Sequence, residues 1–234
     1  MKIAVYSIAL NESSAYVRWR KSCAEADYAI LVDTGSTDGT EMFAYGRILI
    51  QPFRFDDARN AALALVPPDA DICIALDLDE ALEPGWRQAL EQAWRPETNN
   101  AWVNFNFNGE WFLQNNRVHS RWGWRWKYPC HEALTRSIGS DVNSVQVPGM
   151  RIVHRPNPDK GPNNYLELLA WGQFEDPTST RMLHYYGREL MFKGHYQDAI
   201  ERFERYLALD PAFPEERAKT EAFLHECRAK LEEA

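Results

Sequence analysis

Three carboxylate side chains stand within four residues at Asp77-Leu78-Asp79-Glu80, directly after the apolar run Ile72–Leu76. Like charges this close repel one another, so the cluster brings a folded protein no stability of its own. Mg²⁺ and Mn²⁺ prefer oxygen ligands and typically bind one or two carboxylates together with the phosphates of a substrate. The cluster therefore predicts a divalent-metal site. The alternative is an acidic beginning to the helix expected after Pro84, where carboxylates favour the helix dipole.

A second polar segment, residues 33–40, follows the apolar run Tyr28–Val32. Gly35 and Gly39 permit tight turns, and the Asp, Ser and Thr side chains between them offer many hydrogen bonds. Taken alone, the segment is equally consistent with a turn that caps a helix. It contains neither GxGxxG nor GxxxxGK[ST], which disfavours a dinucleotide-binding Rossmann enzyme and excludes a P-loop NTPase.

The elements around these segments alternate between apolar strands and helices over the first hundred residues. Strands are expected at 3–10, 28–32, 47–52 and 71–76, and helices at 12–27, from 40 onward and at 57–66. Fully apolar strands that alternate with helices are typical of a parallel sheet covered on both faces. Ligands bind beyond the carboxyl ends of such strands. Asn11, residues 33–38 and residues 77–80 are therefore expected along one edge of the sheet.

Residues 101–153 alternate apolar with polar side chains. Val103, Phe105 and Phe107 interleave with asparagines, and a second stretch interleaves three tryptophans and Tyr128 with mostly basic residues. A period of two indicates strands that have one wet face. We expect these strands to join the parallel core as antiparallel or mixed strands.

The chain from about residue 181 is predicted to be helical and acidic. One stretch has the spacing of a single tetratricopeptide repeat, with small residues where two helices would touch. Its marker residues are Gly187, Gly194, Tyr196, Ala199, Phe203 and Pro211. A lone repeat cannot bury its apolar face, so it must pack on the first domain or on another subunit. The expected domains are 1–165 and 166–234.

The charge of the chain is unevenly distributed. There are 26 Lys and Arg against 34 Asp and Glu, a net charge of −8, which argues weakly against a dedicated nucleic-acid binder. Residues 101–165 hold eight basic and four acidic residues, a local charge of +4. Two interpretations of this basic segment stay open: a surface that faces a phosphate-bearing ligand, and a solvated strand face.

The four cysteines are widely spaced and form no CxxC pair, which excludes a zinc ribbon and argues against a disulfide framework. Apolar runs are too short to span a membrane, and the amino-terminal run is too short for a signal peptide. We therefore expect a soluble, cytoplasmic protein.

Together these segments resemble the family 2 glycosyltransferases of the GT-A fold over roughly residues 1–165. The matching motifs are residues 8–12 (IALNE), 32–40 (VDTGSTDGT), 55–63 (FDDARNAAL) and 76–80 (LDLDE), the last being the DxD-type motif. The extension is similar to members with tetratricopeptide-like helices after the catalytic domain. The resemblance implies an α/β, mixed but mainly parallel, Rossmann-like sheet flanked by helices, with an all-helical TPR-like extension.

The resemblance also implies a site for a nucleotide-sugar donor. Asp33 would accept a hydrogen bond from the nucleobase, and Asp77 would contact the ribose or the sugar. Arg59 would reach the diphosphate or hold the carboxylates in place, although a salt bridge to Asp56 or Asp57 is the alternative. The loop that contains Lys160 would fold over the phosphates. The full donor-binding set is Asn11, Glu12, Asp33, Ser36, Arg59, Asn60, Asp77 and Lys160.

Metal and catalytic roles follow from the same resemblance. Asp79 would ligate Mn²⁺ or Mg²⁺, and His154 would be a further ligand, with a packed histidine as the alternative. Inverting members use a carboxylate as general base, and Glu132 is the candidate here. The neighbouring His131 would orient Glu132 or bind phosphate, with a loop histidine and a surface glutamate as the alternative. Asp141 is a weaker candidate, and aspartate is the commoner base in this family.

The sequence thus predicts a metal-dependent, inverting glycosyltransferase, and the resemblance favours UDP-sugars as its donors. Two rivals stay open: a nucleotidyltransferase, and an inactive scaffold whose TPR-like helices bind a protein partner. The acceptor is undetermined among saccharides, lipid-linked saccharides, proteins and modified nucleobases. Most tryptophans of residues 101–128 are expected to be buried, with one or two, such as Trp111 or Trp124, near the acceptor. The C-terminal helices would serve a homo-oligomer or a protein partner.

Overall fold

The computed structural model describes residues 1–107, 109–139, 141–156, 165–211 and 213–233. The chain divides into two compact units. A sheet unit comprises Met1–Lys127 and Glu132–Gly161, and a helical unit comprises Tyr128–His131 and Pro162–Ala234. The four residues 128–131 therefore belong to the helical unit although the sheet unit surrounds them in the sequence.

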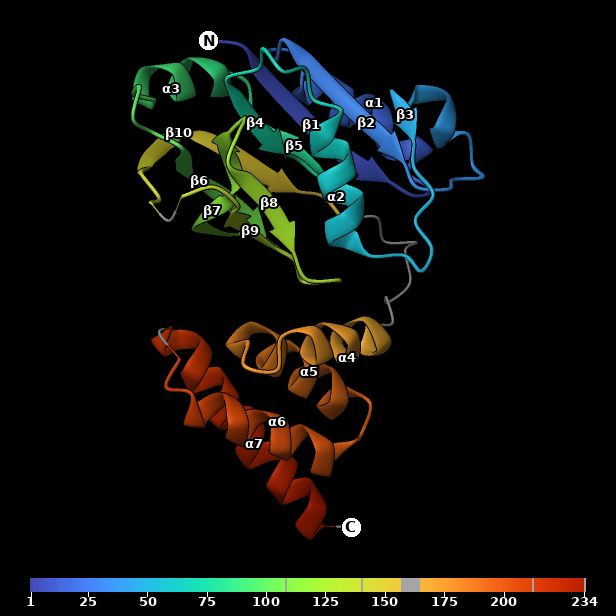
Figure 1. The fold of residues 1–234 in the computed structure, drawn as a ribbon, viewed down its shortest axis with the longest axis vertical. Helices are drawn as coiled ribbons and strands as arrows, with labels where there is room; N and C mark the ends of the chain where they lie inside the picture. The colour runs from blue at the N-terminus through green and yellow to red at the C-terminus, as the bar shows by residue number, and fades with distance from the viewer. Residues whose placement is uncertain (108, 140, 157–164, 212, 234) are drawn as a thin grey trace. The chain divides into compact units, whose positions relative to one another are not determined.

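The sheet unit is built on one eight-stranded sheet with the order β3-β2-β1-β4-β7-β6-β10-β5 (Figure 1). Its strands are β1 (Ile3–Ala9), β2 (Tyr28–Asp33), β3 (Gly46–Arg47), β4 (Ile72–Ala75), β5 (Glu80–Leu82), β6 (Asn100–Phe107), β7 (Glu110–Ser120) and β10 (Ser144–His154). Strands β1 to β4 pair in parallel, β7 is antiparallel to both β4 and β6, and β10 is parallel to β6. The sheet is thus mixed and mainly parallel, as the sequence predicts.

Helices cover both faces of the parallel strands, and the strand sequences show why. Ile3 and Val5 of β1 and Ile72 of β4 pack with α1 (Ser13–Ser22) and α3 (Trp86–Ala93). The alternate residues of the same strands pack with α2 (Phe55–Ala64). Because both faces are covered, all four residues of β4 are buried. The indole N–H groups of Trp19 and Trp86 donate to carbonyl oxygens, which removes the cost of burying them.

Two elements are shorter than the sequence predicts. The third strand is limited to Gly46–Arg47, whereas residues 47–52 were expected to be extended. Pro52 has no N–H to donate to a ladder. The helix expected from Thr40 is a single 3₁₀ turn, Thr40–Phe43, because Ala44 has extended dihedral angles (φ −74°, ψ 141°) that end it.

A small second sheet pairs β8 (Trp124–Lys127) with β9 (Ala133–Arg136) in antiparallel fashion. Trp124 and Trp126 of β8 are buried, and Trp126 packs with Ala62 and Leu63 of α2. Trp111 and Trp122 have exposed rings. The aromatic alternation in this region is therefore only partly a core face, since Phe107 and Phe112 are exposed as well.

The helical unit contains α4 (Leu166–Glu175), α5 (Thr180–Phe192), α6 (Tyr196–Ala208) and α7 (Pro214–Glu232). The Oγ of Ser179 accepts from the N–H of Met182 and caps α5. A Cβ atom at Gly187 would lie 2.6 Å from the ring of Phe203, so only glycine permits the observed approach of α5 to α6.

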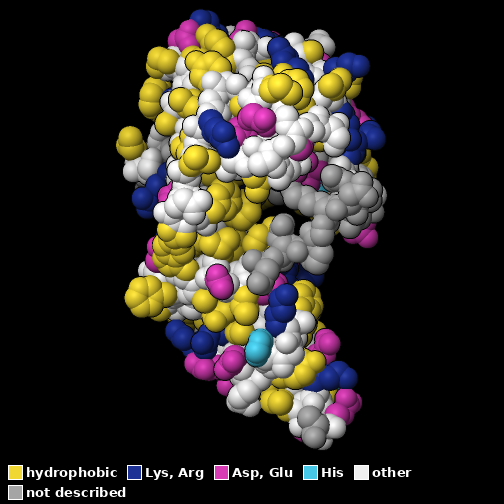
Figure 2. All heavy atoms as spheres, turned by 90° about the vertical axis from the view of Figure 1, so that its right-hand side faces the viewer, with side chains coloured by type: hydrophobic (Ala, Val, Ile, Leu, Met, Phe, Trp, Pro, Cys, Tyr) yellow, Lys and Arg dark blue, Asp and Glu magenta, His cyan; other side chains and the backbone are white. Residues whose placement is uncertain are grey.

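The exposed surface of the helical unit mixes both signs of charge, as Figure 2 shows for the face in view. Arg217 pairs with Asp210 and Glu221, and Arg228 pairs with Glu204. No helix within the described residues is both long enough and apolar enough to cross a membrane.

Candidate active site

Parallel topology brings the predicted site segments to one edge of the sheet. The carboxyl ends of β1, β2, β4, β6 and β10 share this edge, which we call the carboxyl edge. Asn11 follows β1, Asp33 ends β2, Asp77 follows β4 and His154 ends β10. The convergence expected from strand order is therefore present.

Arg59 joins two carboxylates at this edge. Its Nη1 lies 2.7 Å from Oδ1 of Asp77, and its Nε donates to Oε1 of Glu132. The guanidinium also lies 5.1 Å from the ring centroid of Trp126. Arg59 is 7% exposed and lies on the inward face of α2. Of the roles considered for Arg59, holding the carboxylates in place is the one that these contacts match.

The alternative partners of Arg59 are occupied by another arginine. Arg54 lies 2.9 Å from Asp56 and 3.7 Å from Asp57 at the beginning of α2. Both carboxylates lie in the first helical turn, where the helix dipole favours negative charge. The expected salt bridge from Arg59 to this pair is therefore not formed.

A second arginine, which the sequence analysis did not select, completes the cluster. Arg117 lies 3.2 Å from Oδ2 of Asp77 through Nη1, and its Nη2 donates to Oε1 of Glu80. Arg117 comes from β7, whose register beside β4 (Ile74↔Val118) places it next to the end of that strand. Register across an antiparallel neighbour is not readable from the spacing of the motifs, and so the residue was missed.

The two arginines affect the two neighbouring carboxyl groups differently. Burial alone would raise the pKa of Asp77, but Arg59 and Arg117 outweigh it and hold that pKa well below its usual range. Glu80 is 2% exposed, and its burial raises the pKa, with Asp77 and Asp79 adding to the effect while Arg117 opposes it. Asp77 is thus the firmly ionised member of the cluster.

Asp79 and His154 form the pair on which the metal prediction rests. Nε2 of His154 lies 3.4 Å from Oδ2 of Asp79. The pair is held by the antiparallel register of β5 and β10, in which Glu80 faces His154, and by a hydrogen bond from Arg155 N to Asp79 O. Two ligand atoms bound to one ion at a right angle, each about 2.2 Å away, lie roughly 3 Å apart. The spacing therefore fits two ligands of one divalent cation.

The environment of the pair also fits a partly built metal site. His154 stacks on Phe107 with ring centroids 4.8 Å apart, and its Nδ1 makes no hydrogen bond within the described residues. No group of three or more His, Cys, Asp or Glu ligands occurs in the described part of the chain. Any cation held here would need further oxygen ligands, and the phosphates of a substrate are the usual ones for Mg²⁺.

The residues predicted to bind the nucleotide form one interlocked turn. Asp33 is fully buried and accepts hydrogen bonds from the N–H groups of Gly35 and Ser36, and Arg47 lies 3.2 Å from it. Asn11 donates its N–H to Ser36 Oγ and accepts from Thr37 N through Oδ1. These contacts fix the turn at the carboxyl edge and account structurally for its sequence.

Glu12 lies beside this turn and is also buried. Its N–H donates to Oγ1 of Thr40, which in turn donates to Asp38. Burial opposes ionisation of Asp38, but hydrogen bonds from Thr40 and Ser13 hold its pKa well below the usual range. The segment therefore serves as a helix-capping turn, and it also places the side chain of Asn11 at an exposed position.

Asn60 and His131 have partners that differ from the predicted ones. Both ends of the Asn60 amide bond the backbone of Trp126, at 2.9 Å to its oxygen and 2.8 Å to its nitrogen, so Asn60 fastens β8 to α2. His131 belongs to the helical unit, where it stacks on Tyr185 with centroids 4.1 Å apart. Burial, with Arg188 and Arg181 adding to it, lowers the pKa of His131 to about 3.

Two further predictions lie away from this cluster. Asp141 precedes β10 at its amino end, where Asn99 donates to its carbonyl oxygen, so it lies at the opposite edge from Glu132 and Asp77. Lys160 lies outside the described residues.

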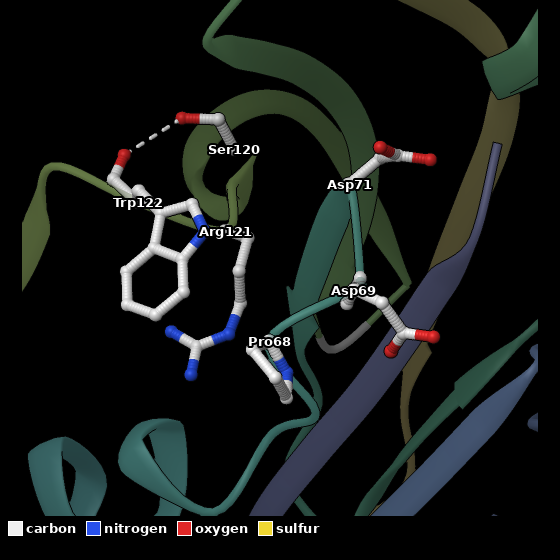
Figure 3. A pocket seen from close by; sticks show the side chains of 7 residues that line it. Pro68, Asp69, Asp71, Ser120, Arg121 and Trp122 are labelled. Carbon is white, nitrogen blue, oxygen red and sulfur yellow. Dashed lines mark hydrogen bonds between the residues drawn. The ribbon is translucent and has the colours of Figure 1, made fainter.

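A pocket of about 280 Å³ is found at the amino end of β4 rather than at the carboxyl edge (Figure 3). Asp69, Asp71, Ser120, Arg121 and Trp122 line it together with Pro68 and Ala70. The guanidinium of Arg121 lies 4.1 Å from the Trp122 ring centroid and donates to the carbonyls of Val66 and Pro67. These contacts fasten the loop between α2 and β4, which explains the pocket without a ligand.

Comparison with known proteins supports the fold. No protein-family model matches the sequence, and no curated protein matches it. A structure of residues 1–349 of TarS from S. aureus, a glycosyltransferase, is similar over 98% of this chain and 88% of that chain, with a TM-score of 0.55 and 12% identity. The structure of 4-diphosphocytidyl-2C-methyl-D-erythritol synthase from Anaerococcus prevotii covers 51% of this chain and 70% of its own, at a TM-score of 0.34 and 9% identity.

The TarS structure is similar to this chain in its fold, whereas the synthase structure resembles only half of the chain and only slightly. The similarity to TarS shows that this chain has a GT-A-like fold: a mixed, mainly parallel sheet flanked by helices, with further helices at the carboxyl terminus.

Proposed function

We propose that this chain is a metal-dependent glycosyltransferase that moves a sugar from a nucleoside-diphosphate donor to an acceptor hydroxyl. The proposal rests on one observation: two groups of interacting side chains lie at the carboxyl edge of a GT-A-like sheet. Asp79 and His154 form a spacing suited to a divalent cation, and Arg59 joins Asp77 to Glu132. Ligands of open α/β sheets bind at this edge.

Asp79 and His154 would hold Mn²⁺ or Mg²⁺ together with the donor's phosphates. When bound, such a cation supplies positive charge that stabilises the departing nucleoside diphosphate. Asn11, Glu12, Asp33 and Ser36 would form the nucleotide side of the same site, because their turn occupies the neighbouring stretch of the edge. We propose UDP as the first nucleotide to test.

Glu132 is the proposed general base. It would take the proton of the acceptor hydroxyl while the acceptor oxygen bonds to the anomeric carbon and the bond from that carbon to the diphosphate oxygen breaks. A single displacement of this kind inverts the anomeric configuration. Arg59 would act as a positioning residue, since its contact fixes Oε1 of Glu132. The same guanidinium keeps Asp77 ionised beside the donor.

The proposal is tested by the release of nucleoside diphosphate from UDP-, GDP- and dTDP-sugars in the presence of Mn²⁺. Slow transfer to water provides a signal even before the acceptor is known. Wild type should release one nucleotide preferentially, and Glu132→Gln should lower the rate by about 10²–10⁴-fold, the usual contribution of a general base. Asp141→Asn is the matched control at the opposite edge. Equal rates for the two variants would contradict the role of Glu132, and no release from any donor would favour the scaffold.

A further inference from the structure

The helical unit contains a cluster of basic side chains that the proposed reaction does not use. Arg181 and Arg188 both lie over the ring of Tyr185, with guanidinium carbons 5.1 and 4.7 Å from its centroid. His131 stacks on the same ring. Arg181 donates to the carbonyl oxygen of His131, and Nη2 of Arg188 lies 3.4 Å from its Nε2. We call Arg181, Arg188, His131 and Tyr185 the arginine cluster.

No carboxylate in the described part of the chain balances the positive charge of the arginine cluster. Within the described residues, no carboxylate lies within 4.0 Å of either guanidinium, and the buried Nε of Arg188 has no hydrogen-bond partner. Since the two guanidinium carbons are 4.7 and 5.1 Å from one centroid, they are at most 9.8 Å apart. Two like charges at this separation repel each other, and the contacts of both guanidinium groups with the Tyr185 ring offset part of that repulsion.

Other arginines of the same unit behave differently. Arg217 and Arg228 are exposed and pair with Asp210 and Glu204. Arg205 has no carboxylate partner among the described residues, but it is exposed and donates to the carbonyl oxygen of Pro177. Arg181 and Arg188 are only partly exposed, so they are less well hydrated, yet they too have no counter-ion within the described residues. Charges with this environment are characteristic of functional sites.

The pKa values of two neighbouring histidines are lowered in part by the positive charge of the arginine cluster. Burial is the main cause that lowers the pKa of His131 to about 3, and Arg188 and Arg181 lower it further. His184 has its pKa lowered to about 4 by burial and then by Arg188, Lys219 and Arg181. Both imidazoles are therefore neutral at pH 7, which leaves the arginines as the charges available to an anion.

We propose that the arginine cluster binds a phosphate group. A phosphate dianion would neutralise both guanidinium groups, and their planar N–H forks match its oxygens. The neutral imidazole of His131 offers one further polar atom. A phosphorylated acceptor and the diphosphate of a nucleotide are the two sources of such a group. Which of these two sources is bound depends on the proposed function. The proposal that the cluster binds phosphate does not depend on it.

Binding is tested by NMR of the His131 imidazole in the full chain, at constant ionic strength set with chloride. The probes are inorganic phosphate, glycerol 1-phosphate and UDP, and the signals are assigned through His131→Gln. Each phosphate should shift the His131 signals saturably and raise its pKa, because a bound dianion offsets the field of the arginines. Arg188→Gln should weaken binding at least tenfold, Arg188→Lys should retain part of it, and Arg228→Gln should not change it.

The outcomes distinguish a phosphorylated acceptor from a nucleotide as the source of the phosphate, and they distinguish the phosphate site from the proposed metal site. A response to glycerol 1-phosphate identifies a phosphomonoester, and a response to UDP alone identifies a nucleotide. No saturable shift, or equal affinity in wild type and a folded Arg188→Gln variant, would overturn the phosphate site. Asp79→Ala should leave the response to glycerol 1-phosphate intact. If the proposed metal site is wrong, this response would therefore still be observed.

Discussion

Nε2 of His154 lies 3.4 Å from Oδ2 of Asp79, although Asp79 directly precedes β5 and His154 ends β10, in distant parts of the sequence. The pairing of β5 with β10 makes this contact, since Glu80 faces His154 across the ladder. A carboxylate and an imidazole at this spacing, on the ligand-binding edge of a GT-A-like sheet, are the basis of the metal-dependent reaction proposed above.

Replacing His154 should weaken metal binding more than it weakens the fold. In His154→Ala, we expect the affinity for Mn²⁺ in the presence of UDP to fall at least tenfold, because the imidazole would supply one of the two proposed protein ligands. Electron paramagnetic resonance of free Mn²⁺ measures this directly. His225→Ala, which removes an exposed histidine of α7, is the control. Unchanged Mn²⁺ affinity in His154→Ala would remove this residue from the site.

Arg59 should be important for stability as well as for activity. Arg59→Ala leaves Asp77 and Glu132 without their shared partner, and loss of one member of a buried ion pair typically costs about 3–5 kcal/mol. Urea denaturation gives the free energy of unfolding. Arg228→Ala breaks an exposed pair with Glu204 and should cost about 0–1 kcal/mol. Similar losses in the two variants would mean that the Arg59 contacts are not stabilising.

Stability should fall as the pH is lowered from 6.5. Burial lowers the pKa of His119 and His184 to about 4 and that of His131 to about 3, against 6.5 for an unperturbed histidine. Between about pH 4 and 6.5, these three histidines are therefore protonated in the unfolded chain but stay neutral in the folded chain. The contribution of these three histidines is fully present above pH 6.5 and declines below it, by up to about 1.4 kcal/mol per pH unit for each histidine. Glu80 contributes in the opposite direction with the slope of one group, because burial raises its pKa to about 8, so the three histidines set the net sign below pH 6.5.

Denaturation curves between pH 7.5 and 5 measure this slope before most carboxylates titrate. The His119 ring is hydrogen-bonded to Tyr6 and to the carbonyl group of Ser120. His119→Gln should therefore reduce the slope of unfolding free energy against pH by the contribution of one histidine. A flat profile over this range would show that the three imidazoles are protonated in the folded protein.

A single methyl group should disturb the helical unit. In Gly187→Ala the new Cβ would lie 2.6 Å from the Phe203 ring, and overpacking of this kind costs about 1–3 kcal/mol. Thermal denaturation should show the loss, and Gly187→Ala with Phe203→Leu should recover part of it. If Gly187→Ala were instead stabilising, as for an exposed helical glycine, the close contact of α5 and α6 would be wrong.

The alternation of strands and helices predicted the fold because it reflects burial. Apolar runs such as Ile72–Leu76 need cover on both faces, and only a sheet between helices provides it. The same reasoning placed Asp33, Asp77 and Asn11 on one edge, since parallel strands end together. It overextended β3, which ends at Arg47 although the apolar run continues to Ile50.

The contacts of the site were less accessible to sequence reasoning. Arg117 reaches Asp77 because of the register of β7 beside β4, and register depends on the whole sheet. Asn60 sits inside a recognised motif, yet its amide is used to hold β8. His131 and Glu132 are adjacent in sequence, but their side chains contact different units, Tyr185 for the first and Arg59 for the second. Sequence neighbours therefore need not share a role.

The central claim is that Asp79 and His154 bind a divalent cation together with a nucleoside diphosphate. Melting temperature measured with UDP, GDP, CDP and dTDP, each with and without Mn²⁺, tests it most directly, because a ligand of the folded state raises the melting temperature by mass action. We predict an increase for one nucleotide that requires Mn²⁺ and is absent in Asp79→Ala. An increase that survives in Asp79→Ala, or none with any nucleotide, would contradict the account.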